Sequence, residues 1–106
     1  MNKSYKINSS EVVQLEKGNI TKLINNKSKT FSGFAEAYIL NIKYKKIKAW
    51  KVHTKINCNL FILSGKIKFV LANYHKDEEL IFKEYILQPK KNNHLFISHG
   101  VMFGFQ

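Results

Sequence analysis

The sequence contains no arginine, a single cysteine, Cys58, and a single proline, Pro89. One cysteine cannot form an intramolecular disulfide, and Cys58 with four scattered histidines matches no zinc-finger spacing. Because arginine is the usual residue for bidentate contacts to guanine and phosphate, its absence argues against sequence-specific reading of nucleic acid. A disulfide-stapled scaffold, a zinc finger and a sequence-specific nucleic-acid-binding domain are therefore poor interpretations of this chain.

Long hydrophobic runs are absent as well. No apolar run approaches the roughly 20 residues of a membrane-spanning helix, and residues 1–10 lack the apolar centre of a signal peptide. We therefore expect a cytoplasmic protein with no part in the membrane. The composition, 44% hydrophobic and 13% aromatic over 106 residues, is typical of a folded chain and predicts a single domain spanning residues 1–106.

Positive charge is the strongest bias in what is present. Eighteen lysines oppose seven acidic residues, which gives a formal net charge of +11. Such an excess favours polyanionic partners, whether nucleic acid, acidic lipid or phosphorylated metabolites, without choosing among them. The many Lys, Asn and Ile residues are equally well explained by an AT-rich genome, so charge alone assigns no function.

Short runs rich in Ile, Val, Phe and Tyr recur at regular intervals and predict β-strands. The predicted strands are residues 35–43, 46–53, 59–63, 66–73, 80–87 and 94–97. Turn-forming residues separate them at 64–65, in a charged loop at 75–79 and in a polar connection at 89–93. This pattern predicts an all-β sandwich or barrel.

The segment 10–25 has two interpretations that the sequence leaves open. Ser10 can cap a short N-terminal helix, or the segment can form two short strands, because Gly18 interrupts the helical pattern. The apolar residues of that imperfect stripe are Val12, Leu15, Ile20, Leu23 and Ile24.

The predicted strand 46–53 carries a candidate cationic site. Strict alternation places Lys51 and His53 on one face of the strand and Lys48 on the other. If the first face lines the mouth of a barrel, Lys51 and His53 form a site for an anion. If that face points outward, both side chains are simply solvated.

Three stretches of the chain carry a family resemblance: IKAWKVHTK at 47–55, Asn59-Leu60, and SGKIKFVL at 64–71. Together they resemble the core of the cupin proteins related to dTDP-4-dehydrorhamnose 3,5-epimerase, and ISHGVMFGFQ at 97–106 resembles that family's later I-P-x-G-x-x-H-G-F-Q stretch. The resemblance implies a double-stranded β-helix, the cupin jelly roll, which usually dimerises. It also implies a nucleotide-linked 4-keto sugar as the partner, in cell-surface polysaccharide synthesis.

The resemblance implies Lys51 and His53 as the catalytic residues, although most of the family's acid–base set is replaced. Lys51 stands where the epimerases have the histidine that removes the proton next to the 4-keto group, and Phe103 stands at a second histidine. Cys58 replaces a lysine, and the tyrosine acid would follow Gln106. Lys51 is then either a base, its pKa lowered by burial and neighbouring charge, or a cation that holds the keto oxygen or the diphosphate.

The predicted substrate-binding residues are Phe34, Glu36, Lys48, Cys58, Asn59 and Phe103. The run FSGFAE at 31–36 resembles the family's R-G-F-F-x-E. This resemblance places Phe34 and Glu36 against the base of the nucleotide, with ordinary core packing as the alternative for Phe34. Lys48 matches an arginine that holds phosphate. It reaches the same ligand as Lys51 only if the strand contains a bulge or the ligand takes another pose.

No metal and no cofactor are expected. Metal-using cupins place two histidines, a glutamate and a later histidine around the ion, and this chain has Lys51, His53, Cys58 and Phe103 at those positions. Cys58 is expected to be a small buried hydrophobe. His75 and His94 lie beside predicted turns, where we expect solvated imidazoles.

Three functions from different classes remain open. The first is a sugar-nucleotide epimerase or isomerase acting on a dTDP-4-keto-6-deoxy sugar. The second is a catalytically silent cupin that binds a nucleotide sugar or a partner enzyme, and the third, ranked below these two, is a basic protein that binds nucleic acid without specificity. Because the resembled family closes its barrel with strands beyond residue 106, we expect a homodimer whose second copy covers the exposed edges.

Overall fold

The structure of the protein is a computed structural model, in which residues 4–74 and 79–106 are described. These residues form nine β-strands and no helix, so that none of them builds a helix long and apolar enough to cross a membrane. The strands are β1 (Tyr5–Asn8), β2 (Val12–Val13), β3 (Ile20–Thr21), β4 (Lys48–Val52), β5 (Cys58–Phe61), β6 (Ile67–Tyr74), β7 (Leu80–Leu87), β8 (His94–Ile97) and β9 (Met102–Phe105). The prediction of an all-β protein is confirmed.

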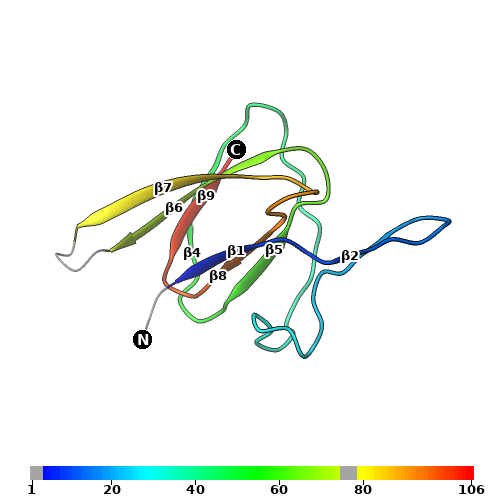
Figure 1. Ribbon diagram of the computed structural model, residues 1–106. Helices are drawn as coiled ribbons and strands as arrows, with labels where there is room; N and C mark the ends of the chain where they lie inside the picture. Colours follow the sequence, from blue (N-terminus) through cyan, green and yellow to red (C-terminus); the bar gives the residue numbers. More distant parts are fainter. Residues whose placement is uncertain (1–3, 75–78) are drawn as a thin grey trace.

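Two antiparallel sheets form the two layers of the body (Figure 1). The smaller sheet has the strand order β1-β8-β5, and the larger sheet has the order β4-β9-β6-β7. Consecutive strands such as β4 and β5 lie in different sheets, so the chain passes back and forth between the layers. This passage brings the start of β5 opposite the end of β4.

The core lies between the facing sides of the two sheets. Alternate residues of each strand point inward, so that β8 contributes Leu95 and Ile97, β6 contributes Phe69 and Leu71, and β9 contributes Phe103. All five are buried. Burial of one such side chain stabilises the fold by about 1.5–3 kcal/mol.

A pair of tyrosines joins the two sheets where β1 faces β7. The hydroxyl oxygens of Tyr5 and Tyr85 lie 2.7 Å apart, and the rings meet edge to face with their centroids separated by 5.6 Å. Burial, together with the hydrogen bond and the charge of Tyr85, raises the pKa of Tyr5 to about 12. The Tyr5 phenol therefore stays protonated at neutral pH.

Most of the predicted strands are present. Residues 46–53, 59–63, 66–73, 80–87 and 94–97 contain or overlap β4 to β8, whereas β1 and β9 were not expected. The predicted strand at 35–43 is wrong, because β-propensity forms a strand only beside a pairing neighbour and no described strand pairs with this segment. Of the predicted loop 75–79, residues 75–78 lie outside the described residues.

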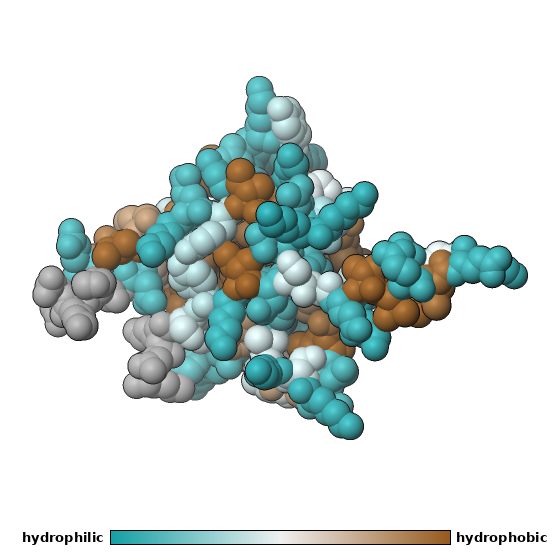
Figure 2. Space-filling model, in the orientation of Figure 1, coloured by the Kyte–Doolittle hydropathy of each residue, from teal (hydrophilic) through white to brown (hydrophobic). Residues whose placement is uncertain are grey.

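Residues 10–25 form two short strands and not a helix. β2 pairs with β3 through Val12 and Thr21, and this arm projects from the body (Figure 1). At its base, the backbone N–H of Ser10 donates to Asn93 Oδ1 at 2.7 Å, and Asn93 Nδ2 donates back to Ser10 Oγ at 2.8 Å. Figure 2 shows hydrophobic side chains gathered along the arm, where Leu15 and Ile20 are exposed.

Candidate functional site

A bulge in β4 brings the two predicted lysines to the same side of the larger sheet. β4 pairs with β9 so that Lys51 lies opposite Phe103 and Lys48 lies opposite Phe105, which leaves two β4 residues against Gly104 alone. Directly paired residues point to the same side of a sheet, so both lysines share the core-facing side with the two phenylalanines. The strict alternation that separated Lys48 from Lys51 is therefore wrong.

Gly104 allows β4 and β9 to approach closely at the bulge. A Cβ atom at position 104 would lie 2.7 Å from the Cβ atom of Ala49 and 3.3 Å from the carbonyl oxygen of Lys48. Contacts this short displace the neighbouring strand. The missing side chain at Gly104 thus helps to place Lys48 beside Lys51.

Four of the predicted site residues meet at one end of the roll. Lys51 pairs with Phe103, and the ring centroid of His53 lies 6.2 Å from that of Phe103. Cys58 begins β5 in the opposite sheet, close enough for the charge of Lys51 to act on its thiol. The cationic cluster, as we name Lys51, His53, Cys58 and Phe103, therefore occupies the four positions that the sequence resemblance placed around one ligand.

Exposure varies across the cationic cluster. Lys51 is exposed, His53 and Cys58 are half-buried, and Phe103 is buried. Burial raises the pKa of the Cys58 thiol, and the ammonium group of Lys51 acts in the opposite direction. The thiol is therefore protonated at neutral pH and a weak nucleophile. An exposed Lys51 is suited to holding an anion at the mouth of the roll.

Phe34 and Glu36 lie on the strap, the name we give to residues 22–47 between β3 and β4. The side chain of Phe34 is 78% exposed, so the alternative that it packs in the core is wrong. Glu36 is exposed as well. Among the described residues, no hydrogen bond, ion pair or ring contact joins either of them to Lys51 or His53. The structure shows no direct contact between either of them and the cationic cluster.

Asn59 lies on the opposite side of its sheet from Cys58. It pairs with Phe96 on the outer side, where its Nδ2 donates to the carbonyl oxygen of Thr30 at 3.0 Å and its Oδ1 lies 2.7 Å from His94 Nε2. Alternation in β5 therefore separates the two neighbouring residues that the sequence assigned to one substrate site. The structure does not bring Asn59 to the cationic cluster.

The expectation of a solvated His94 is wrong. His94 is only 7% exposed. Its ring stacks on that of Phe61, with the centroids 4.3 Å apart and an angle of 13° between the ring planes. Because Asn59 uses its amide nitrogen on Thr30, His94 Nε2–H donates to the remaining amide oxygen. Strand alternation alone gave no sign of this, since it does not show that the strap covers this face. His75 lies outside the described residues.

Stability is expected to fall as the pH drops because of His94. Burial lowers its pKa in the folded protein below the ordinary value of 6.5, so the unfolded chain binds the proton more readily. The stabilising contribution is present above about pH 6.5 and is lost as the pH falls from there towards the lowered pKa. Lys6, on the same face of β1, offers an imidazolium ion no counter-charge.

Urea denaturation at pH 7.5 and pH 5 measures this effect. His94→Gln keeps an amide hydrogen-bonding group but does not titrate, so its stability is expected to change less between the two pH values than that of the wild type. Equal pH dependence in the two proteins would assign the acid sensitivity to other groups.

The tyrosine pair lies too far from Lys51 to act on the same reacting atoms. One row of the larger sheet runs from Lys48 through Phe105 and Phe69 to Tyr85, which places the outer strands about 14 Å apart at roughly 4.8 Å per strand. The rings of Phe69 and Phe105, with centroids 5.4 Å apart, fill the row. Tyr5 and Tyr85 therefore have a structural role.

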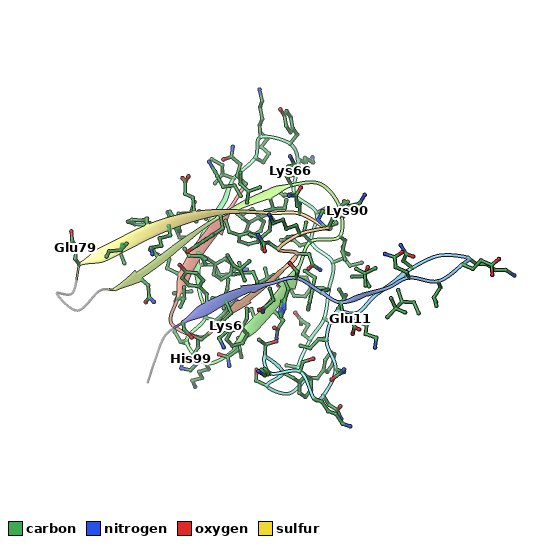
Figure 3. The ribbon with its side chains drawn as sticks, in the orientation of Figure 1. Lys6, Glu11, Lys66, Glu79, Lys90 and His99 are labelled. Carbon is green, nitrogen blue, oxygen red and sulfur yellow. The ribbon has the colours of Figure 1, made fainter. Side chains whose placement is uncertain are left out.

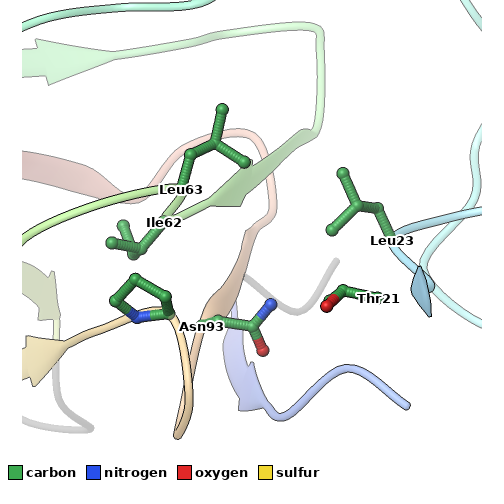
Figure 4. Close-up of a pocket in the computed structure, with 6 residues that line it drawn as sticks. Thr21, Leu23, Ile62, Leu63 and Asn93 are labelled. Atoms are coloured by element: carbon green, nitrogen blue, oxygen red, sulfur yellow. The ribbon is translucent and has the colours of Figure 1, made fainter. Parts of the chain in front are cut away.

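A hollow of about 190 Å³ lies at the other end of the roll (Figure 4). It is lined by Thr21, Leu23, Ile62, Leu63, Pro89 and Asn93. Cys58 begins β5, whereas Ile62 follows the end of that strand, so the hollow is remote from the cationic cluster. The amide of Asn93 is already engaged by Ser10 at the base of the arm.

The residues of the cationic cluster do not suit a metal ion. His53 supplies one imidazole, Cys58 a protonated thiol, Lys51 an ammonium group without a lone pair, and Phe103 no donor. Within residues 4–74 and 79–106, no three His, Cys, Asp or Glu side chains gather where they could hold an ion. That the protein works without a metal stays a prediction.

The two facing sheets define a cupin-like jelly roll of the kind found in sugar isomerases. The chain superposes on the crystal structure of a dTDP sugar isomerase from Desulfovibrio desulfuricans G20 with a TM-score of 0.82 and 23% sequence identity. The match covers 95% of this chain and 66% of that chain, so this chain spans about two thirds of the other's length. This similarity establishes the fold and confirms the predicted jelly roll. No protein-family model and no curated protein matches the sequence.

Proposed function

We propose that the protein binds a dTDP-4-keto-6-deoxy sugar and epimerises or isomerises it, in the cytoplasm, for surface polysaccharide synthesis. The observation that carries this proposal is the structural similarity to a dTDP sugar isomerase over 95% of the chain. The cationic cluster supports it, because four of the positions that the sequence resemblance assigned to the substrate site lie together at one end of the roll.

In this proposal His53 acts as the base and Lys51 stabilises the enolate. The imidazole of His53 removes the proton from the carbon next to the ketone, and the C–H electron pair forms a carbon–carbon double bond. The carbonyl electrons move to the oxygen, where the ammonium group of Lys51 stabilises the enolate. Water then protonates the same carbon from the opposite face to complete an epimerisation, or another position of the enolate to give an isomer, and His53 releases its proton to the solvent. Lys48, on the same side of β4, holds the diphosphate.

Solvent exchange tests this function. The protein is incubated in D₂O with dTDP-4-keto-6-deoxyglucose, and NMR measures deuterium at the carbons next to the ketone. Incorporation that is lost in His53→Gln is the expected result. If the wild type incorporates no deuterium, the proposed isomerase activity is wrong, and if it does not bind dTDP either, nucleotide-sugar binding is wrong as well.

A catalytically silent cupin is the second candidate. Two of the four residues in the cationic cluster supply no base at neutral pH, since Phe103 has no titratable group and the raised pKa of Cys58 keeps its thiol protonated. A silent binding protein would bind dTDP in the same experiment without incorporating deuterium into the sugar. That result would indicate that the protein binds nucleotide sugars and is not an enzyme.

Strand β4 does not offer the kind of surface that binds single-stranded nucleic acid. Single-stranded nucleic acid is gripped by aromatic rings that lie beside positive charge on one exposed surface. Here the bulge turns Lys48 and Lys51 to the core-facing side, whereas Trp50 packs on Phe82 across the outer side, with ring centroids 5.7 Å apart. Salt-dependent binding to any DNA, without a response to dTDP, would favour this function over the sugar isomerase.

We further propose that the protein forms a homodimer through the outer face of the larger sheet. One row on this face runs from Phe82 through Ala72 and Met102 to Val52, and both Phe82 and Val52 are about half exposed. An apolar face of this kind is typical of a protein interface.

Charge favours a second copy as the occupant of this face. Of the charged residues in strands β4, β6, β7 and β9, only Lys68 and Glu84 point outward with Phe82. The face is therefore neutral on a chain of net charge +11, so two copies can meet there without strong repulsion. A two-fold contact can pair Lys68 of each copy with Glu84 of the other.

Phe82→Lys is expected to convert the dimer into a monomer, because it buries a charge in the apolar contact. Light scattering during gel filtration would show the mass fall from twice 12.4 kDa to 12.4 kDa. Phe34→Lys makes the same change on the exposed strap and should leave the dimer intact. A monomeric wild type, or equal loss in both variants, contradicts this interface.

A further inference from the structure

The backbone of His53 is held by a turn on the other side of the mouth. The carbonyl oxygen of His53 accepts a hydrogen bond from the backbone N–H of Gly100 at 2.7 Å. Gly100 belongs to the turn 98–101 between β8 and β9 and has a φ of 89°, which glycine adopts without strain. The position of this turn therefore affects where the imidazole of His53 lies.

Asn57 holds the same turn through the residue next to Gly100. Asn57 Oδ1 accepts a hydrogen bond from the backbone N–H of His99 at 2.9 Å and lies 3.2 Å from His99 Nδ1. Figure 3 shows His99 at the end of the roll where β1 begins. The amide oxygen of Asn57 thus holds His99, and Gly100, the residue after His99, holds the backbone of His53.

The amide of Asn57 has a contact at each end. Its oxygen is engaged by His99, and its nitrogen lies 3.5 Å from the hydroxyl oxygen of Ser32 on the strap, at the long limit of a hydrogen bond. A flip of the amide would set its NH₂ group against the N–H of His99. The stronger contacts, those to His99, determine its orientation.

We propose that Asn57 is a positioning residue for His53, acting through His99 and Gly100. This inference rests on the proposed function, in which His53 is the base. A base removes a proton efficiently only when it is held within hydrogen-bonding reach of that proton, and small displacements of a reacting group reduce rates strongly. Loss of Asn57 is therefore expected to slow proton transfer while leaving the lysines, and with them nucleotide binding, in place.

Three variants separate positioning from general support of the strap. Asn57→Leu removes both ends of the amide, whereas Asn57→Asp keeps an acceptor for the His99 N–H. Asn59→Leu is the matched control, because Asn59 also contacts the strap, at Thr30, but is joined to His94 and not to the turn 98–101. All are compared at a temperature at which circular dichroism shows them folded.

The measurements are hydrogen exchange of the Gly100 amide, NMR titration of the His53 imidazole, deuterium incorporation into the sugar and dTDP affinity. In Asn57→Leu, the Gly100 amide should exchange at least about tenfold faster, and the His53 titration should shift. Incorporation should fall about tenfold or more, with dTDP affinity changed less than about twofold. Asn57→Asp should remain close to the wild type, and Asn59→Leu should leave Gly100 protected.

Several outcomes would overturn the inference. The first is an unchanged exchange rate of the Gly100 amide in Asn57→Leu, and the second is an equal change of that rate in Asn59→Leu. The third is faster exchange at Gly100 in Asn57→Leu with normal deuterium incorporation into the sugar. If the wild type incorporates no deuterium, the proposed function fails. The Gly100 amide and the His53 titration then still decide whether Asn57 holds His53.

Discussion

Replacement of Leu95 by alanine is expected to lower the free energy of unfolding by about 2–5 kcal/mol. Leu95 is 0% exposed and lies on β8, the central strand of the smaller sheet, between Ile7 and Leu60. Backbone pairing on both sides keeps these neighbours from closing the cavity. Because small domains are stable by only about 5–15 kcal/mol, this single change removes a large part of the total.

Urea denaturation followed by circular dichroism measures the loss, and the midpoint of thermal unfolding should fall by about 10 °C or more. Leu40→Ala is the matched control, because Leu40 lies on the strap and is 47% exposed. Its effect should stay within about 0.5 kcal/mol. Similar losses in the two variants would contradict a core that lies between the sheets.

Strands β4 to β8 could be predicted because their side chains follow the period of a sheet, whereas β1 and β9 were missed. In β6, Ile67, Phe69 and Leu71 point to the core and alternate with residues of the outer face. Polar turns bound these runs, so their limits could also be read closely. Alternation could not predict which strands pair, since partners such as β4 and β9 lie far apart in the sequence although they are neighbours in the sheet.

The strap shows where this reasoning fails. Residues 35–43 have the composition of a strand, but they pair with no described strand, and Tyr38 and Ile39 remain exposed. Propensity describes how well a residue fits a sheet and does not supply the neighbouring strand. The burial of His94 was missed for a related reason, because its contacts Asn59 and Phe61 lie on another strand, far away in sequence.

Only part of the candidate site could be predicted from the sequence, and the roles of its residues stay predictions. Of the residues that the resemblance selected, the structure brings Lys51, His53, Cys58 and Phe103 together, whereas Phe34 and Glu36 make no contact with them and Asn59 lies on the outer side of its sheet. The bulge that adds Lys48 depends on the fit between Ala49 and Gly104, which lie on different strands. A local pattern within β4 carries no information about that fit.

Replacement of Lys51 by methionine is expected to slow deuterium incorporation by about 100- to 1000-fold, the usual cost of removing one group that stabilises an oxyanion. Methionine keeps an unbranched apolar chain beside Phe103, and Lys51 is exposed, so the fold should be unaffected. The affinity for dTDP should change little if Lys48 holds the diphosphate. A large loss of dTDP affinity would instead indicate that Lys51 binds the diphosphate and not the enolate oxygen.

Lys83→Met separates a local role of Lys51 from the effect of net charge. Lys83 lies in the same row of the larger sheet, across Phe103 and Leu71 from Lys51, so this variant removes the same charge at the opposite edge. Screening at physiological salt limits the influence of an exposed charge to about 8 Å, and three strand spacings exceed that distance. Incorporation should therefore be normal in Lys83→Met. An equal loss in both variants would mean that the chain attracts its anionic substrate through its overall charge of +11, and that Lys51 has no special place in the reaction.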